Sequence, residues 1–146
     1  MIKRFSFLFL FQICFHVFSQ DLTCKDFKNG TFKGETIEPI KLEWEVIRKG
    51  NSQIEKAKGV PEEFKSLLAK IPLTMYGNLK WVGDCSYILT YDASKAKLTE
   101  SQKTINTIGG VFVEVTKVEG RTFYYKSTMK YNGEEIVTTG KLYKEK

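Results

Sequence analysis

The chain has 146 residues, with 23 lysines and arginines against 17 acidic residues, so its formal net charge is +6. This length suits a single domain with a modest hydrophobic core. The single histidine, His16, leaves little scope for histidine-based metal sites or for Ser-His-Asp and Cys-His catalysis.

Residues 1–19 are predicted to be a secretory signal peptide. Lys3 and Arg4 precede an apolar run over residues 5–17, which is too short to span a bilayer as a stable helix. Val and Ser stand three and one positions before a cleavage site ahead of Gln20. The mature protein is therefore expected to be exported, to the periplasm or the extracellular medium.

Removal of this segment changes the chemistry of what remains. It takes away His16, Cys14 and two cations, which lowers the formal net charge from +6 to +4. A single β-rich domain over residues 20–146 then has no histidine, which excludes histidine-dependent catalysis and the usual zinc and copper ligands. We therefore expect no enzyme activity, no metal site and no cofactor.

Cys24 and Cys85 are the two cysteines left after cleavage. An oxidising compartment favours a disulfide between them. A lipidated Cys24 is an alternative, although Asp21 stands where a lipobox has an aliphatic residue. Free thiols are another, although no histidine is present to activate them.

Most of the mature chain alternates apolar and polar residues, the pattern of half-buried strands. The turn signals Gly50-Asn51, Glu119-Gly120 and Asn132-Gly133 separate several of these segments. The expected strands cover residues 31–32, 42–46, 53–55, 79–82, 85–91, 111–116, 122–131 and 135–143.

Two segments are expected to be helical. Residues 61–71 form a short amphipathic helix that begins at Pro61, has apolar residues at i, i+3, i+4 and i+7, and stops at Pro72. We expect it to cover the sheet, with a role at a membrane surface as the alternative. Thr99 and Gln102 have the spacing of a capping box and predict a second helical turn, ended by a Gly-Gly pair.

About eight short strands with hairpin turns predict a mainly β fold: an antiparallel meander barrel or a strongly curled sheet. A barrel of this size has room for its own side chains or for one small ligand.

The segment around Gly30 and Phe32 resembles the Gly-x-Trp first strand of lipocalins and fatty-acid-binding proteins, with Phe32 in the aromatic place. The resemblance implies a lipocalin-like, calycin-type β-barrel. It also implies that a basic residue of the last strand, Lys141 or Lys144, packs near Phe32.

A wider resemblance is to a family of short, functionally uncharacterised exported proteins of Gram-negative bacteria. It covers much of the first two-thirds of the mature chain and implies a fold but no activity. Relative to this pattern, the helix at residues 61–71 is an insertion. The matching residues are Cys24, Phe27, Lys28, Gly30, Phe32, Arg48, Gln53, Glu55, Lys80, Trp81, Asp84, Cys85, Tyr87 and Leu89.

Aromatic residues on the strands are the best candidates for function. They either fill a packed core or line a ligand cavity with few polar anchors. Arg48 would then hold an anionic head group, or it lies on the surface of its strand. The candidate ligand-binding residues are Trp44, Arg48, Trp81, Tyr87, Tyr91, Phe123 and Tyr125.

The sequence thus favours a non-enzymatic exported β-barrel that binds a small apolar or amphipathic molecule. The alternative is an interaction or structural module with a filled core, which presents a sheet edge or the helix at residues 61–71 to a protein partner. Acidic residues such as Glu43 and Glu45 are expected on solvated strand faces. We expect a monomer with no nucleic-acid partner and no transmembrane segment in the mature chain.

Overall fold

The computed structural model describes residues 22–59, 61–68 and 72–146, without the side chains of residues 64, 67 and 68. The predicted signal peptide, residues 1–19, lies outside the described residues.

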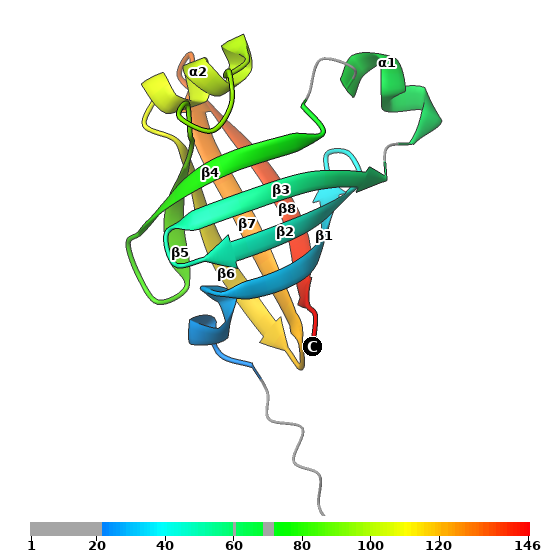
Figure 1. Ribbon diagram of the computed structural model, residues 1–146, viewed down its shortest axis with the longest axis vertical. Coiled ribbons are helices and arrows are strands. Elements are labelled where there is room, and N and C mark those ends of the chain that lie inside the picture. The colour runs from blue at the N-terminus through cyan, green and yellow to red at the C-terminus, as the bar shows by residue number, and fades with distance from the viewer. Residues whose placement is uncertain (1–21, 60, 69–71) are drawn as a thin grey trace, which may run out of the picture.

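Eight antiparallel strands form a closed barrel in chain order, which confirms the predicted meander barrel (Figure 1). Closure occurs where the first strand pairs with the last, from Phe32 opposite Lys144 to Glu38 opposite Thr139. The strands are β1 (Gly30–Glu38), β2 (Leu42–Lys49), β3 (Ser52–Gly59), β4 (Thr74–Trp81), β5 (Ser86–Tyr91), β6 (Val111–Glu119), β7 (Thr122–Tyr131) and β8 (Glu134–Lys144).

Strands β1 and β4 are longer than the sequence predicted. The predicted β1 covered only residues 31–32, and the predicted β4 began only at Leu79. Glycines hide the alternation: Gly34 and Gly77 occupy inward positions where an apolar residue is expected. A Cβ on Gly77 would lie 2.5 Å from Leu89 Cδ1, so the large neighbour fills the space that Gly77 leaves.

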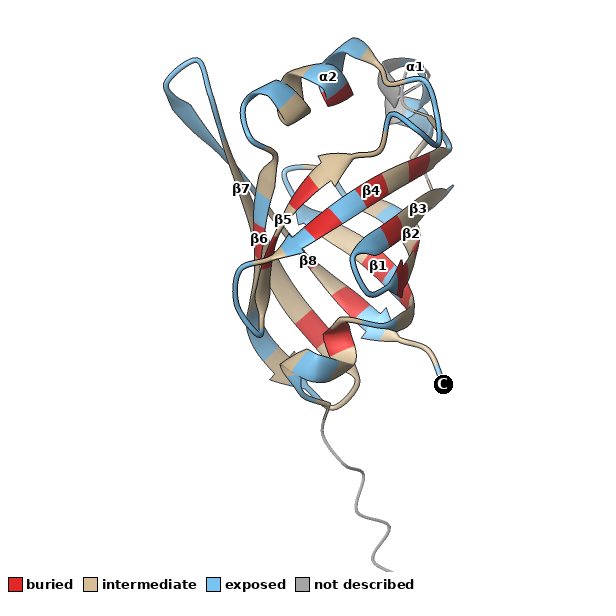
Figure 2. Ribbon diagram, turned by 60° about the vertical axis from the view of Figure 1, so that its left-hand side comes forward, coloured by how far each residue is buried: buried red, intermediate tan, exposed pale blue. Residues whose placement is uncertain are grey.

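The β7–β8 hairpin turns at Asn132 and Gly133, both with positive φ (51° and 82°), as the Asn-Gly signal predicts. Its ladder continues to Tyr131 opposite Glu134. The pairing of β6 with β7 reaches only Thr128, so the end of the hairpin projects beyond the barrel wall (Figure 2).

Short helical segments flank the two ends of the barrel. At one end lies the 3-10 helix η1 (Cys24–Phe27), and across the other lies α2 (Glu100–Thr107), as Figure 1 shows. The predicted capping box of α2 is present, with both Thr99–Gln102 hydrogen bonds formed. The predicted helix at residues 61–71 is helical in its described part, as η2 (Glu62–Phe64) and α1 (Lys65–Leu68). Its residues 69–71 lie outside the described residues.

The predicted disulfide is present and fastens η1 to the barrel. Cys24 and Cys85 are 61 positions apart in sequence, and their Cα atoms are separated by 5.0 Å, an ordinary distance for a disulfide. The link holds Phe27 of η1 in the base of the barrel, where it is fully buried with Phe32 and Phe123. Residues 24–27 therefore act as a plug for this end.

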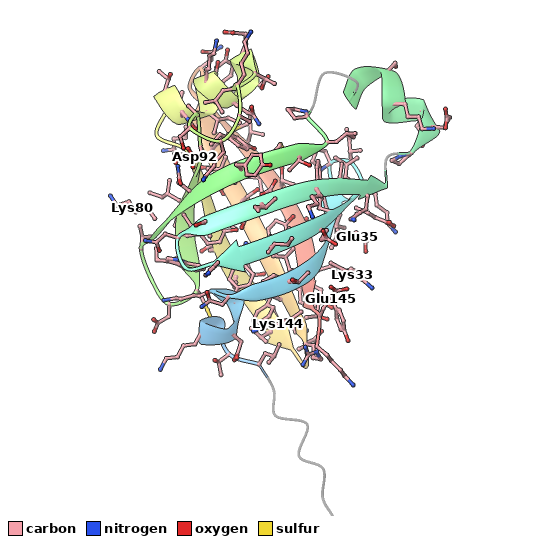
Figure 3. The ribbon with its side chains drawn as sticks, in the orientation of Figure 1. Lys33, Glu35, Lys80, Asp92, Lys144 and Glu145 are labelled. Atoms are coloured by element: carbon pink, nitrogen blue, oxygen red, sulfur yellow. A yellow bond between two sulfur atoms is a disulfide. The ribbon has the colours of Figure 1, made fainter. Side chains whose placement is uncertain are left out.

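Four charged side chains of β1, β8 and the residue after β8 pair on the outer side of the barrel, whereas that of Lys144 reaches the base. Lys33 pairs with Glu145 at 3.2 Å on the outer side of the barrel, where Figure 3 shows both. Lys141 pairs with Glu35, also at 3.2 Å. The Lys144 ammonium lies 5.9 Å from the centre of the Phe32 ring and donates to Asp26 O at 2.7 Å. Of the two basic residues expected beside Phe32, Lys144 therefore takes the position and helps to hold η1.

Candidate ligand-binding cavity

The upper half of the barrel, between the Phe27 base and α2, contains a partly open cavity of about 940 Å³. Inward residues of β1 to β8 supply its wall, because alternate side chains of each strand point to the interior. Most of the lining is apolar or aromatic. The apolar and aromatic wall residues are Trp44, Val46, Met75, Tyr87, Leu89, Tyr91, Val111, Val113, Tyr125 and Leu142.

Helix α2 covers the mouth and contributes Gln102 and Ile105 to the lining. Asn106 ties the helix to the barrel through two hydrogen bonds with the backbone of Tyr91. The Tyr91 N–H donates to Asn106 Oδ1 at 2.7 Å, and Asn106 Nδ2 donates to Tyr91 O at 2.8 Å. Figure 2 shows α2 across the upper end of the barrel, where the Asn106 side chain attaches it to the end of β5.

Arg48 lies at the floor of the cavity and is buried, with 3% of its surface exposed. The predicted alternative, that Arg48 lies on the surface of its strand, is therefore wrong. Its guanidinium donates to Gln53 Oε1 at 2.5 Å, to Tyr87 OH at 2.5 Å and to Phe27 O at 3.1 Å. It also lies 3.9 Å from the centre of the Phe27 ring. Burial lowers the pKa of Arg48, and the nearby Tyr87 and Glu55 oppose this shift. The Arg48 cation is therefore bound mainly by the protein itself.

Glu55 of β3 also lines the cavity. Gln53 Nε2 donates to Glu55 Oε1, and this is the one hydrogen bond of the carboxylate within the described residues. Burial raises the pKa of Glu55, while the Gln53 hydrogen bond and the Arg48 charge act in the opposite direction. The side chain is half-buried by area because the cavity reaches it, yet protein surrounds it on the other sides. The carboxylate is thus poorly solvated and only partly bound.

Tyr91 and Tyr125 add two phenolic hydroxyls to the polar part of the wall. Burial raises the pKa of both hydroxyls, and the charge of Glu55 adds to each shift, so both remain neutral at physiological pH. Neither hydroxyl has a hydrogen-bond partner among the described residues, and each side chain lines the cavity. Each can therefore donate to or accept from a bound molecule.

The structure brings five of the seven candidate residues together around one space: Trp44, Arg48, Tyr87, Tyr91 and Tyr125. The other two do not line it. Phe123 is fully buried in the base, with its ring centre 5.0 Å from that of Phe27. Trp81 also packs against Phe27, beside the base, where its Nε1 donates to Gly50 O at 3.2 Å and Lys28 lies over its ring.

Sequence reasoning missed Gln53, Glu55, Met75 and the contribution of α2 to the cavity lining. The alternation of a strand could have placed Gln53 and Glu55 on the same face, because they are two positions apart. Their inward orientation was not predicted, because inward positions are recognised by their apolar residues and both of these residues are polar. The α2 residues approach the cavity only through tertiary structure.

Comparisons with protein-family models, curated proteins and solved structures found no match. No helix in the described part of the chain has the length and hydrophobicity needed to cross a membrane. Among residues 22–59, 61–68 and 72–146, no group of three or more His, Cys, Asp and Glu side chains is arranged to hold a metal ion.

Proposed function

We propose that this protein is a non-enzymatic, lipocalin-like β-barrel that binds one small apolar or amphipathic molecule in its interior. The cavity of about 940 Å³ carries the proposal. Known ligand pockets measure about 300–1,000 Å³ and combine apolar walls with a few polar groups. The wall here is likewise mainly apolar by area, and its polar groups include Arg48, Gln53, Glu55 and several hydroxyls.

The division of the interior supports binding over a merely structural role. Protein interiors pack densely, and an empty apolar space loses the contacts that its lining would otherwise make. The Phe27, Phe32 and Phe123 side chains pack the base fully. A ligand would supply the missing contacts in the upper half.

A location outside the cytoplasm belongs to the same proposal. The Cys24–Cys85 disulfide supports it, because such links persist mainly in oxidising compartments. The alternative interaction module receives less support. The described strands close into a barrel, which leaves the projecting end of the β7–β8 hairpin as an unpaired strand edge, and the interior above the base is hollow.

Titration with N-phenyl-1-naphthylamine, a neutral apolar fluorophore, tests the proposal. We expect saturable binding with one site per chain. Val111→Trp places an indole in the cavity, whereas Phe112→Trp, the matched control, adds one to the outer face of the same strand. Val111→Trp should abolish binding and Phe112→Trp should preserve it. Failure of the unmodified protein to bind, or equal binding by both variants, would contradict an interior site.

A further inference from the structure

The two charged side chains deep in the cavity differ in how far the protein already binds them. Arg48 uses three N–H donors on Gln53, Phe27 and Tyr87, and one face of its guanidinium lies on the Phe27 ring. Glu55 accepts one hydrogen bond, from Gln53. A carboxylate has about four acceptor positions, so most of the capacity of Glu55 remains for a bound molecule.

The position of Glu55 makes this capacity usable. Its side chain lines the cavity, and the described residues place no salt-bridge partner on it. Arg48 is connected to Glu55 by hydrogen bonds only through Gln53. The Gln53 amide oxygen accepts from the arginine, and the amide nitrogen donates to the carboxylate. The cation therefore offsets part of the negative charge without occupying the carboxylate.

The aromatic groups around Glu55 suit a positively charged partner, which would also favour the ionised carboxylate against the effect of burial on its pKa. Tyr91 and Tyr125 lie close enough for its charge to act on both hydroxyls. Their rings and the Trp44 indole line the same cavity, and aromatic faces attract cations. Both hydroxyl oxygens are without a partner among the described residues and can accept a hydrogen bond from an ammonium group.

We propose that the cavity selects amphipathic molecules with a protonated amine head group, which Glu55 binds, with an apolar tail against the upper wall. This inference rests on the proposed function and specifies its ligand class. An anionic head group would meet the Glu55 carboxylate, and it would have to displace protein contacts to reach Arg48. A metal cation would find a single deep carboxylate among the described cavity residues, short of the several oxygen ligands that hard cations require.

Three ligands of equal chain length test the proposal: decylammonium, decanol and decanoate. Each competes with N-phenyl-1-naphthylamine for the unmodified protein at neutral pH. We expect decylammonium to bind at least about tenfold more tightly than decanol, as one charge-assisted hydrogen bond implies, and decanoate to bind least.

The variant Glu55→Gln should lower the affinity for decylammonium by about tenfold and leave decanol within a factor of about three. The control is Glu43→Gln, which removes an exposed carboxylate from the outer side of β2 and should change neither affinity. If Glu55→Gln does not fold, the ranking of the three ligands on the unmodified protein decides alone.

The failures are distinguishable. Equal binding of decylammonium and decanol, or a preference that Glu55→Gln retains, would overturn the amine proposal and leave the apolar cavity intact. Absence of binding by the fluorophore and by all three ligands would overturn both proposals.

Discussion

The base and the upper half of this barrel use the same eight strands in opposite ways. In the base, Phe27, Phe32 and Phe123 are fully buried, with ring centres 5.0 to 6.1 Å apart, and a disulfide holds the plug in place. In the upper half, residues of the same strands surround a cavity of about 940 Å³. The comparison indicates that tight packing is concentrated in the base, away from the proposed ligand site.

The charges follow the same division. Arg48 belongs to the base, where three hydrogen bonds and an aromatic face bind it. Glu55 belongs to the upper half, where one hydrogen bond leaves it largely available. The four predictions below test this contrast, in order of decreasing effect.

Truncation of one aromatic residue in each half gives the largest expected effect. Phe123→Ala should lower the free energy of unfolding by about 3–5 kcal/mol, because it opens a void in a packed core. Tyr125→Ala, two positions further along β7, should cost about half as much, since that side chain already borders empty space. Urea denaturation of both variants measures the difference, and equal losses would remove the distinction between the halves.

Loss of the disulfide should have a similar effect on the base. Replacement of Cys24 and Cys85 together by serine should lower stability by ~4 kcal/mol, from the entropy of a chain loop of 61 positions. Reduced unmodified protein serves as the matched comparison in the same denaturation assay. A doubly substituted protein as stable as the oxidised one would show that η1 does not depend on this link.

The attachment of α2 should affect the upper half alone. Asn106→Ala removes both hydrogen bonds to the Tyr91 backbone and should cost about 1–2 kcal/mol. Because α2 covers the mouth, release of the bound fluorophore should also become faster in stopped-flow measurements. Asn78→Ala, at an exposed position of β4, is the control. Unchanged release from the Asn106 variant would mean that α2 does not limit access.

The smallest effect is on the pH dependence of stability. Burial raises the pKa of Glu55 above its ordinary value of 4.5, so the folded protein binds this proton more tightly than the unfolded chain does. The contribution of Glu55 to the free energy of unfolding is therefore fully present below about pH 4.5, and it is lost as the pH rises through the folded-state pKa. Glu55→Gln should remove that decline, whereas Glu43→Gln should retain it. Denaturation series from acidic to neutral pH would contradict the assignment if both variants lost stability in parallel.

Alternation and turn chemistry were sufficient to predict the barrel, because half-buried strands and Asn-Gly hairpins depend on local sequence. Cys24 and Cys85 predicted their disulfide because few cysteines remain to pair. The end of β1 and the start of β4 were not predictable, since Gly34 and Gly77 interrupt the apolar pattern and only neighbouring strands explain them.

The candidate site was predictable in part. Five aromatic or cationic residues do line one cavity, because strand periodicity places alternate residues inside. It was not predictable that Phe123 packs in the base while Tyr125 lines the cavity. Both side chains point inward from β7, and only their height within the barrel differs. The arrangement of Arg48, Gln53 and Glu55 depends on the register of β2 with β3, which pairs Arg48 with Gln53.

The central claim is that a ligand enters the upper half and leaves the base unchanged. Two-dimensional NMR of the isotopically labelled protein, titrated with decanol, tests it most directly. The account predicts shift changes at cavity-wall residues such as Leu89, Val113 and Tyr125, with Phe27, Phe32 and Phe123 unaffected. Changes confined to the outer surface of the barrel, or none at saturating decanol, would contradict it.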